Sequence, residues 1–90
     1  MFSRQQIETL TQAILAHLAA HPELVQALAA ETGIIPGDLR RMSGDPGFSQ
    51  AMLDFIVADD QRLLDFAAGQ GLSPADVAHA RAALEAGAVI

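Results

Sequence analysis

The chain has 90 residues, 51% of them apolar, with five arginines, no lysine, eleven acidic residues and a net charge of −6. This length gives one domain with a modest core, and so acidic a surface repels phosphate backbones and anionic lipids. Cysteine is absent, which excludes disulfides, thiolate chemistry and cysteine-based metal sites. Because good helix formers dominate and β-branched and aromatic residues are scarce, we expect an all-α fold.

The first half of the chain is punctuated as three helices. Ser3 and Gln6 have the spacing of a capping box, and apolar residues then recur at helical intervals. His21-Pro22 ends this helix and starts the next. The phrase GIIPGDL closes the second helix and opens a third. Its cap position is Ile35, which has no side-chain hydrogen-bond acceptor, so we expect this helix to begin weakly.

The second half repeats this plan. Asp45-Pro46, in the loop SGDPG, predicts the start of a fourth helix, and Asp59 the cap of a fifth. The phrase GLSPADV then closes the fifth helix at its glycine and opens a sixth, with Ser73 as the N-cap. Gly87 is expected to end that helix, which gives six in all.

The two glycine–proline phrases lie 38 positions apart, and the similarity continues upstream of them. The matched pairs are Ala13 with Ala51, Leu15 with Leu53, Leu18 with Ile56, Val25 with Leu63, Leu28 with Phe66, and Ala29-Ala30 with Ala67-Ala68. Repeated helical units bury a shared core by packing together. We therefore predict an all-α, compact six-helix globule over residues 1–90, built from two similar three-helix units at about 5–43 and 44–87.

The sequence contains no arrangement typical of catalysis. His17 and His21 stand four apart, a spacing at which two histidines of one helix bind a metal. However, Pro22 predicts that the helix stops near His21, so we expect the pair not to share a face, and no third ligand follows at a suitable spacing. The acidic run between positions 54 and 65 flanks helix ends, which favours a solvated face over acid–base chemistry. We expect no enzyme activity, no cofactor and no metal.

Nucleic-acid binding is an alternative that the charge disfavours. The segment LAAETGIIPGDLRR has the apolar and glycine spacing of a helix–turn–helix motif and ends in Arg40 and Arg41, the candidate phosphate contacts. Its second helix begins with proline, glycine and aspartate where base contacts belong, and the chain has few cations. We therefore expect nucleic acid not to be the partner.

Protein binding is the function that we predict. Leu15 and Leu53 occupy matching positions beside the main apolar stripe of each unit. They either widen the buried face or line an exposed docking patch next to the acidic helix ends, where Asp54, Asp59 and Asp60 are the further candidates. We expect a non-catalytic interaction module whose partner is another protein or a second copy of the chain.

A small-molecule pocket is the remaining alternative. Phe48, Phe55 and Phe66, together with the methionines, would line it between the two units. Aromatic residues and methionines at helical spacing more often form plain core. The apolar tail AGAVI is expected either to pack locally, to fray or to dock.

One ordered set of residues carries a family resemblance, which spans positions 44–84 and extends more loosely over the N-terminal half. The set comprises Asp45-Pro46, Phe48, Leu53-Asp54-Phe55, Asp59 or Asp60, Leu63-Leu64, Phe66, Gly71-Leu72 and Pro74. It resembles a family of small alphaproteobacterial proteins that is described as a domain of unknown function. The resemblance implies a bacterial, cytoplasmic protein and implies no activity. Cytoplasmic location also agrees with the polar N-terminus and with the lack of any apolar run near the ~20 residues of a membrane span.

Overall fold

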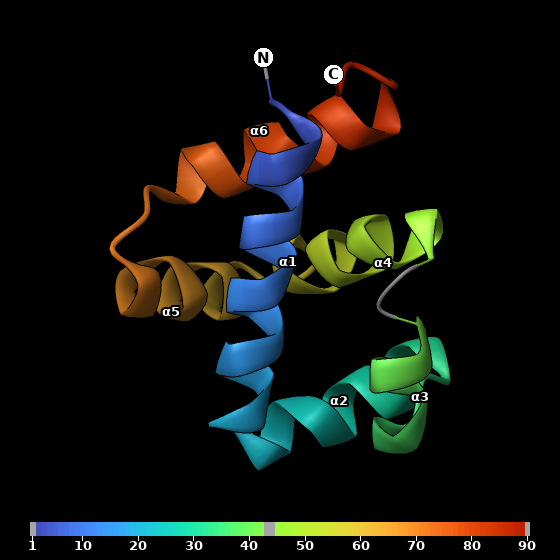
Figure 1. The fold of residues 1–90 in the computed structure, drawn as a ribbon. Helices are drawn as coiled ribbons and strands as arrows, with labels where there is room; N and C mark the ends of the chain where they lie inside the picture. Colours follow the sequence, from blue (N-terminus) through green and yellow to red (C-terminus); the bar gives the residue numbers. More distant parts are fainter. Residues whose placement is uncertain (1, 43–44, 90) are drawn as a thin grey trace.

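The computed structural model describes residues 2–42 and 45–89, except for the side chains of Pro36, Arg40 and Pro46. The described chain is all-α, as predicted, and measures 32 × 26 × 18 Å (Figure 1). None of its helices combines the length and the apolar character needed to cross a membrane. The helices are α1 (Arg4–Ala19), α2 (Pro22–Thr32), α3 (Pro36–Met42), α4 (Pro46–Val57), α5 (Asp60–Gln70) and α6 (Pro74–Glu85).

The helices begin at the predicted capping residues. The Ser3 hydroxyl accepts a hydrogen bond from the Gln6 backbone N–H, and the Gln6 side chain accepts one from the Ser3 N–H, which completes a capping box. α3, which starts after Ile35, has seven residues, whereas α6, which starts after the capping residue Ser73, has twelve. The other side-chain caps are Asp45 to the Gly47 N–H, Asp59 to the Arg62 N–H and Ser73 to the Ala75 N–H.

Two glycines end α2 and α5 in the left-handed conformation. Gly33 has φ 77° and Gly71 has φ 66°, values that cost a residue with a Cβ atom about 1–2 kcal/mol. At Gly71 the N–H donates to the Ala68 carbonyl and the next N–H, of Leu72, donates to the Ala67 carbonyl, which is the Schellman pattern. The duplicated phrase therefore ends helices in both halves, as its glycines predict.

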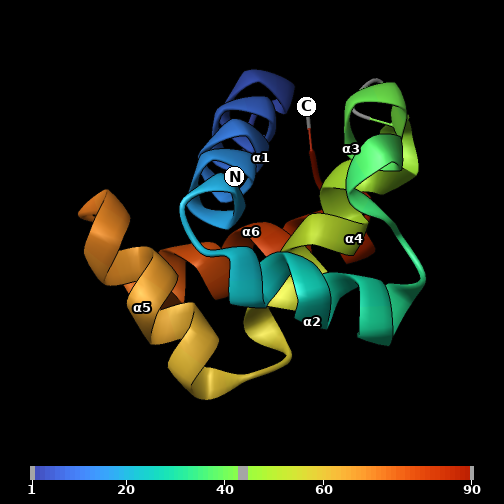
Figure 2. The ribbon, with the colours of Figure 1, turned by 90° about the horizontal axis from the view of Figure 1, so that it is seen from below.

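α4 is the central helix of the fold. α1, α5 and α6 all pack against it, with α5 on one side of α1 and α3 on the other (Figures 1 and 2). The core at its surface is apolar apart from Thr11 and His17, which are also buried. The largest fully buried side chains are Phe48, Phe66, Ile14, Leu18, Leu28, Met52, Leu53, Ile56 and Val77.

The two halves pack differently. α6 lies against α4 along much of its length, whereas α3 makes few contacts with α1. The lengths differ as well, because α1 has 16 residues and α4 has 12. One contact does join matched positions: the Thr11 hydroxyl donates to the Ser49 hydroxyl at 3.0 Å, across the 38-residue offset.

Candidate functional site

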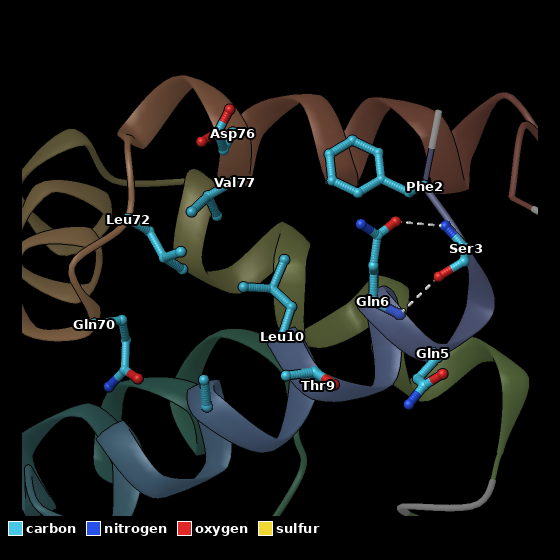
Figure 3. Close-up of a pocket in the computed structure, with 11 residues that line it drawn as sticks. Phe2, Ser3, Gln5, Gln6, Thr9, Leu10, Gln70, Leu72, Asp76 and Val77 are labelled. Carbon is cyan, nitrogen blue, oxygen red and sulfur yellow. Dashed lines mark hydrogen bonds between the residues drawn. The ribbon is translucent and has the colours of Figure 1, made fainter.

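An open groove lies between α1 and the turn that joins α5 to α6, and we call it the α1/α6 groove (Figure 3). Its volume is about 490 Å³, within the range of binding sites in proteins. The apolar lining residues are Phe2, Leu10, Ala13, Leu72 and Val77, and the polar ones are Ser3, Gln5, Gln6, Thr9, Gln70 and Asp76.

One face of α1 forms the first wall of the groove. Gln6, Thr9, Leu10 and Ala13 follow the i, i+3, i+4, i+7 spacing, which aligns side chains along one side of a helix. Leu10 and Ala13 are half-buried against the core, and Gln6 and Thr9 are exposed. The wall is therefore an apolar strip with a hydrogen-bonding edge.

The α5–α6 turn forms the second wall. Leu72 precedes the N-cap Ser73, and Val77 follows one turn into α6, which is the spacing of a hydrophobic staple. Val77 is fully buried, whereas Leu72 remains 38% exposed and lies at the groove (Figure 3). The Schellman turn before it holds the backbone of Leu72 in place. The groove thus has an exposed aliphatic side chain on a backbone that is held in place.

Phe2 closes one end of the groove. It forms a parallel backbone bridge with Val89, and both side chains pack against the core. At Val89 the apolar tail therefore packs locally. The groove as a whole presents an apolar floor, a rim of amides and hydroxyls, and one carboxylate, that of Asp76. This chemistry suits the burial of an apolar ligand surface with hydrogen bonds at its edges.

A second pocket, of about 400 Å³, lies where α1, α2 and α5 meet. His17 is buried there, with its ring centroid 4.2 Å from that of His21 and 5.4 Å from that of Phe66. The two histidines thus lie in contact, and the expectation that they face apart is wrong, because the short link between α1 and α2 turns His21 back onto α1. Burial lowers the pKa of His17, and His21 lowers it further, against the opposing effect of Asp65 and Glu23.

Arg62 in this second pocket is already paired within the chain. Its guanidinium lies 3.9 Å from the centroid of the Phe55 ring and donates to the Phe55 carbonyl at 2.7 Å. It also donates to the Glu31 carboxylate at 2.8 Å, and this hydrogen bond lowers the pKa of Glu31. Arg62 on α5 thus joins its helix to α2 through Glu31.

Among the described residues, no group of three or more histidines and carboxylates could hold a metal ion.

The predicted docking residues differ in their exposure. Leu53 is fully buried against the core, so of its two predicted roles it widens the buried face of α4, and the exposed patch is wrong for this residue. Leu15 is half-buried against the same core. Asp54 accepts a hydrogen bond from Arg81 at 2.8 Å, which ties α4 to α6. Asp59 caps α5 and Asp60 is exposed in its first turn.

The arginines of the nucleic-acid alternative lie on the short helix α3. Arg41 is exposed and pairs with Asp38 one turn earlier. The side chain of Arg40 lies outside the described part of the chain. The guanidinium of Arg41 is thus paired with a carboxylate of its own helix, which disfavours a contact with phosphate.

The alternative of an aromatic pocket between the two units is wrong, because its phenylalanines form plain core. Phe48, Phe55 and Phe66 are buried in the core, and none of them lines either pocket described above. Sequence reasoning missed the α1/α6 groove, although Leu72 carried a signal of it. A residue that precedes an N-cap stands outside the helix, so a leucine at this position faces solvent on one side.

Comparison with known proteins identifies the family. No curated protein and no solved structure shows significant similarity to the chain. A family model described as "Protein of unknown function (DUF3572)" matches residues 4–87, which include all six helices and both walls of the groove. The chain therefore belongs to the DUF3572 family.

Proposed function

We propose that this protein is a non-catalytic interaction module and that the α1/α6 groove is its docking surface. The observation that carries the proposal is the exposed Leu72 beside an apolar floor that includes Phe2 and Leu10. Apolar surface gathered in a groove and rimmed by polar groups is typical of sites that bind protein segments. This proposal moves the docking surface away from the surroundings of Leu53.

The chemistry of the lining supports binding rather than catalysis. Its polar groups are hydroxyls, amides and a single carboxylate, Asp76. Acid–base catalysis relies on titratable groups set within reach of a reacting atom, often as a pair. Amides and hydroxyls instead act as hydrogen-bond partners for a bound chain.

The two alternatives fit less well. A small molecule would be sheltered on few sides in an open groove, whereas ligand sites bury about 70–90% of a drug-sized ligand. Nucleic acid remains disfavoured by the net charge of −6 and by the pairing of Arg41 with Asp38. A protein segment, which needs only one face covered, suits the groove best.

The test is a selection of peptides on the full chain. A displayed library of random peptides of about 16 residues, some four helical turns, is selected against the immobilised protein. Binding of each enriched peptide is then measured by fluorescence anisotropy. We expect Leu72→Ala to weaken binding about tenfold, as truncation of an interface anchor does. Leu64→Ala is the matched control, because Leu64 is 49% exposed on α5 and does not line the groove.

A second pair of variants keeps the test independent of folding effects. Thr9→Trp adds a bulky side chain to the exposed edge of the groove, while Gln12→Trp adds the same group elsewhere on α1, and both positions are exposed. We expect only Thr9→Trp to block binding. No enriched peptide, or enriched peptides insensitive to both groove variants, would refute the proposal.

We also propose the finer features that the sequence predicts. The family resemblance supports a bacterial cytoplasmic setting, which cell fractionation would contradict if the protein appeared with membranes or outside the cell. The contact between Thr11 and Ser49 and the left-handed Gly33 and Gly71 support two related three-helix units. An experimental structure in which the halves fail to superpose would refute that relation.

A further inference from the structure

The α1/α6 groove lies on an acidic protein and has one charged lining residue. That residue is Asp76, in the first turn of α6. The chain carries a net charge of −6, and Arg41, Arg62 and Arg81 are paired with acids of the chain itself. A cation brought to this groove by a partner would therefore be attracted by Asp76 and by the net negative charge of the chain.

We propose that the groove binds an amphipathic helix of another protein, with aliphatic side chains on its floor and a lysine or arginine beside Asp76. This inference rests on the proposed function and specifies its partner. In this complex the bound helix packs against both α1 and α6, and its basic residue lies beside Asp76 at the rim formed by α6.

The arrangement of α1 and α6 favours a helix as the occupant. Both helices pack on α4 and make few contacts with each other, so their facing sides remain open to a further helix. Strand addition needs a free sheet edge, and the described backbone has only the isolated bridge between Phe2 and Val89. Polyproline segments bind in grooves lined by several aromatic residues, whereas this lining has Phe2 alone.

The carboxylate of Asp76 is available for a partner. In a capping box, the side chain at this third helical position bonds back to the N-cap backbone, as Gln6 does with Ser3. In α6 the Ser73 hydroxyl accepts a hydrogen bond from the Ala75 N–H, and within the described part of the chain the Asp76 carboxylate accepts none. Asp76 is exposed at the groove rim (Figure 3).

Charge also argues against a second copy of the chain as the occupant. A symmetric dimer would use the same surface on both subunits. It would bring together two molecules of net charge −6 and two copies of Asp76 at one interface. Like charges at an interface oppose association, whereas a basic helix gains from the same field.

The peptides selected on the full chain test this inference through their sequences and their dependence on Asp76. We expect leucine-type residues at helical spacing, a lysine or arginine on the flank, and helical circular dichroism on binding. Asp76→Asn should weaken binding about fivefold in low salt, and less as salt is raised. Asp60→Asn is the matched control, because it makes the same change of charge in the first turn of α5, outside the groove. We expect it to leave the affinity within about twofold.

The outcomes separate this inference from the proposed function. Peptides that lose binding with Leu72→Ala but are extended, or lack basic residues, would overturn the basic helix and leave the docking groove standing. Equal effects of Asp76→Asn and Asp60→Asn would also overturn it, because the field would then be general. Self-association of the chain, measured by sedimentation and abolished by Leu72→Ala, would assign the groove to a second copy instead. If the selection yields no peptide that binds, both proposals are overturned.

Discussion

Replacing Gly71 by alanine tests the local origin of the α5–α6 turn, which forms one wall of the groove. Gly71 has φ 66°, and a Cβ atom built there would meet no heavy atom within 4 Å. Steric clash with neighbours is therefore excluded as the cause of any loss. The remaining cost is the left-handed backbone conformation, which is about 1–2 kcal/mol for an L-residue with a side chain.

Gly69→Ala is the matched control, two residues earlier. Gly69 lies within α5, has no positive φ and also has open space around a built Cβ. Alanine at a helical position is favoured over glycine by up to about 1 kcal/mol. The same chemical change is thus expected to destabilise the fold at Gly71 and to stabilise it at Gly69, with a difference of about 2 kcal/mol.

Urea unfolding followed by far-ultraviolet circular dichroism measures both variants, because the chain has no tryptophan or tyrosine for fluorescence. We expect the midpoint to fall by about 1 M for Gly71→Ala and to rise for Gly69→Ala. The reasoning is refuted if both changes have the same sign, since Gly71 would then not depend on its left-handed conformation.

Two further predictions concern buried side chains. Leu53→Ala should lower the free energy of unfolding by about 2–5 kcal/mol, and Leu15→Ala by less, because Leu53 is fully buried and Leu15 only in part; equal losses in urea unfolding would contradict this difference. The pKa of His17 lies below its ordinary value of 6.5, so the unfolded chain takes up a proton first as the pH falls. The contribution that neutral His17 makes to stability is therefore complete above pH 6.5, and it is lost as the pH drops from there towards the folded pKa. Wild type should therefore lose more stability than His17→Phe between about pH 8 and pH 5.5, and identical losses would exclude His17 as the cause.

The sequence predicts the local structure of the α5–α6 turn at the groove, but it does not predict the groove itself. The phrase GLSPADV predicted a helix that ends at its glycine and a next helix capped by Ser73, and the structure has both. That Leu72 and Val77 border an open groove depends on where α1 runs. α1 is distant in the sequence, so no local pattern predicts its position.

Leu15 and Leu53 illustrate the same limit. Both lie beside the apolar stripe of their helices, and the sequence treats them as equivalent. In the structure, Leu53 lies on the central helix α4 and is fully buried, whereas Leu15 lies on α1 and is only half-buried against the same core. A periodic pattern identifies the inner face of a helix, but the place of that helix in the packed fold decides how far the buried face extends.

The sequence by itself determined the all-α class and the boundaries of the helices, because caps, prolines and left-handed glycines act through bonds within a few residues. Only the tertiary structure decided that α6 lies along α4 while α3 stays away from α1, that His17 meets Phe66, and that Leu72 borders a groove. These contacts join segments far apart in the chain. They follow from how the apolar faces fit together, which no short stretch of sequence specifies.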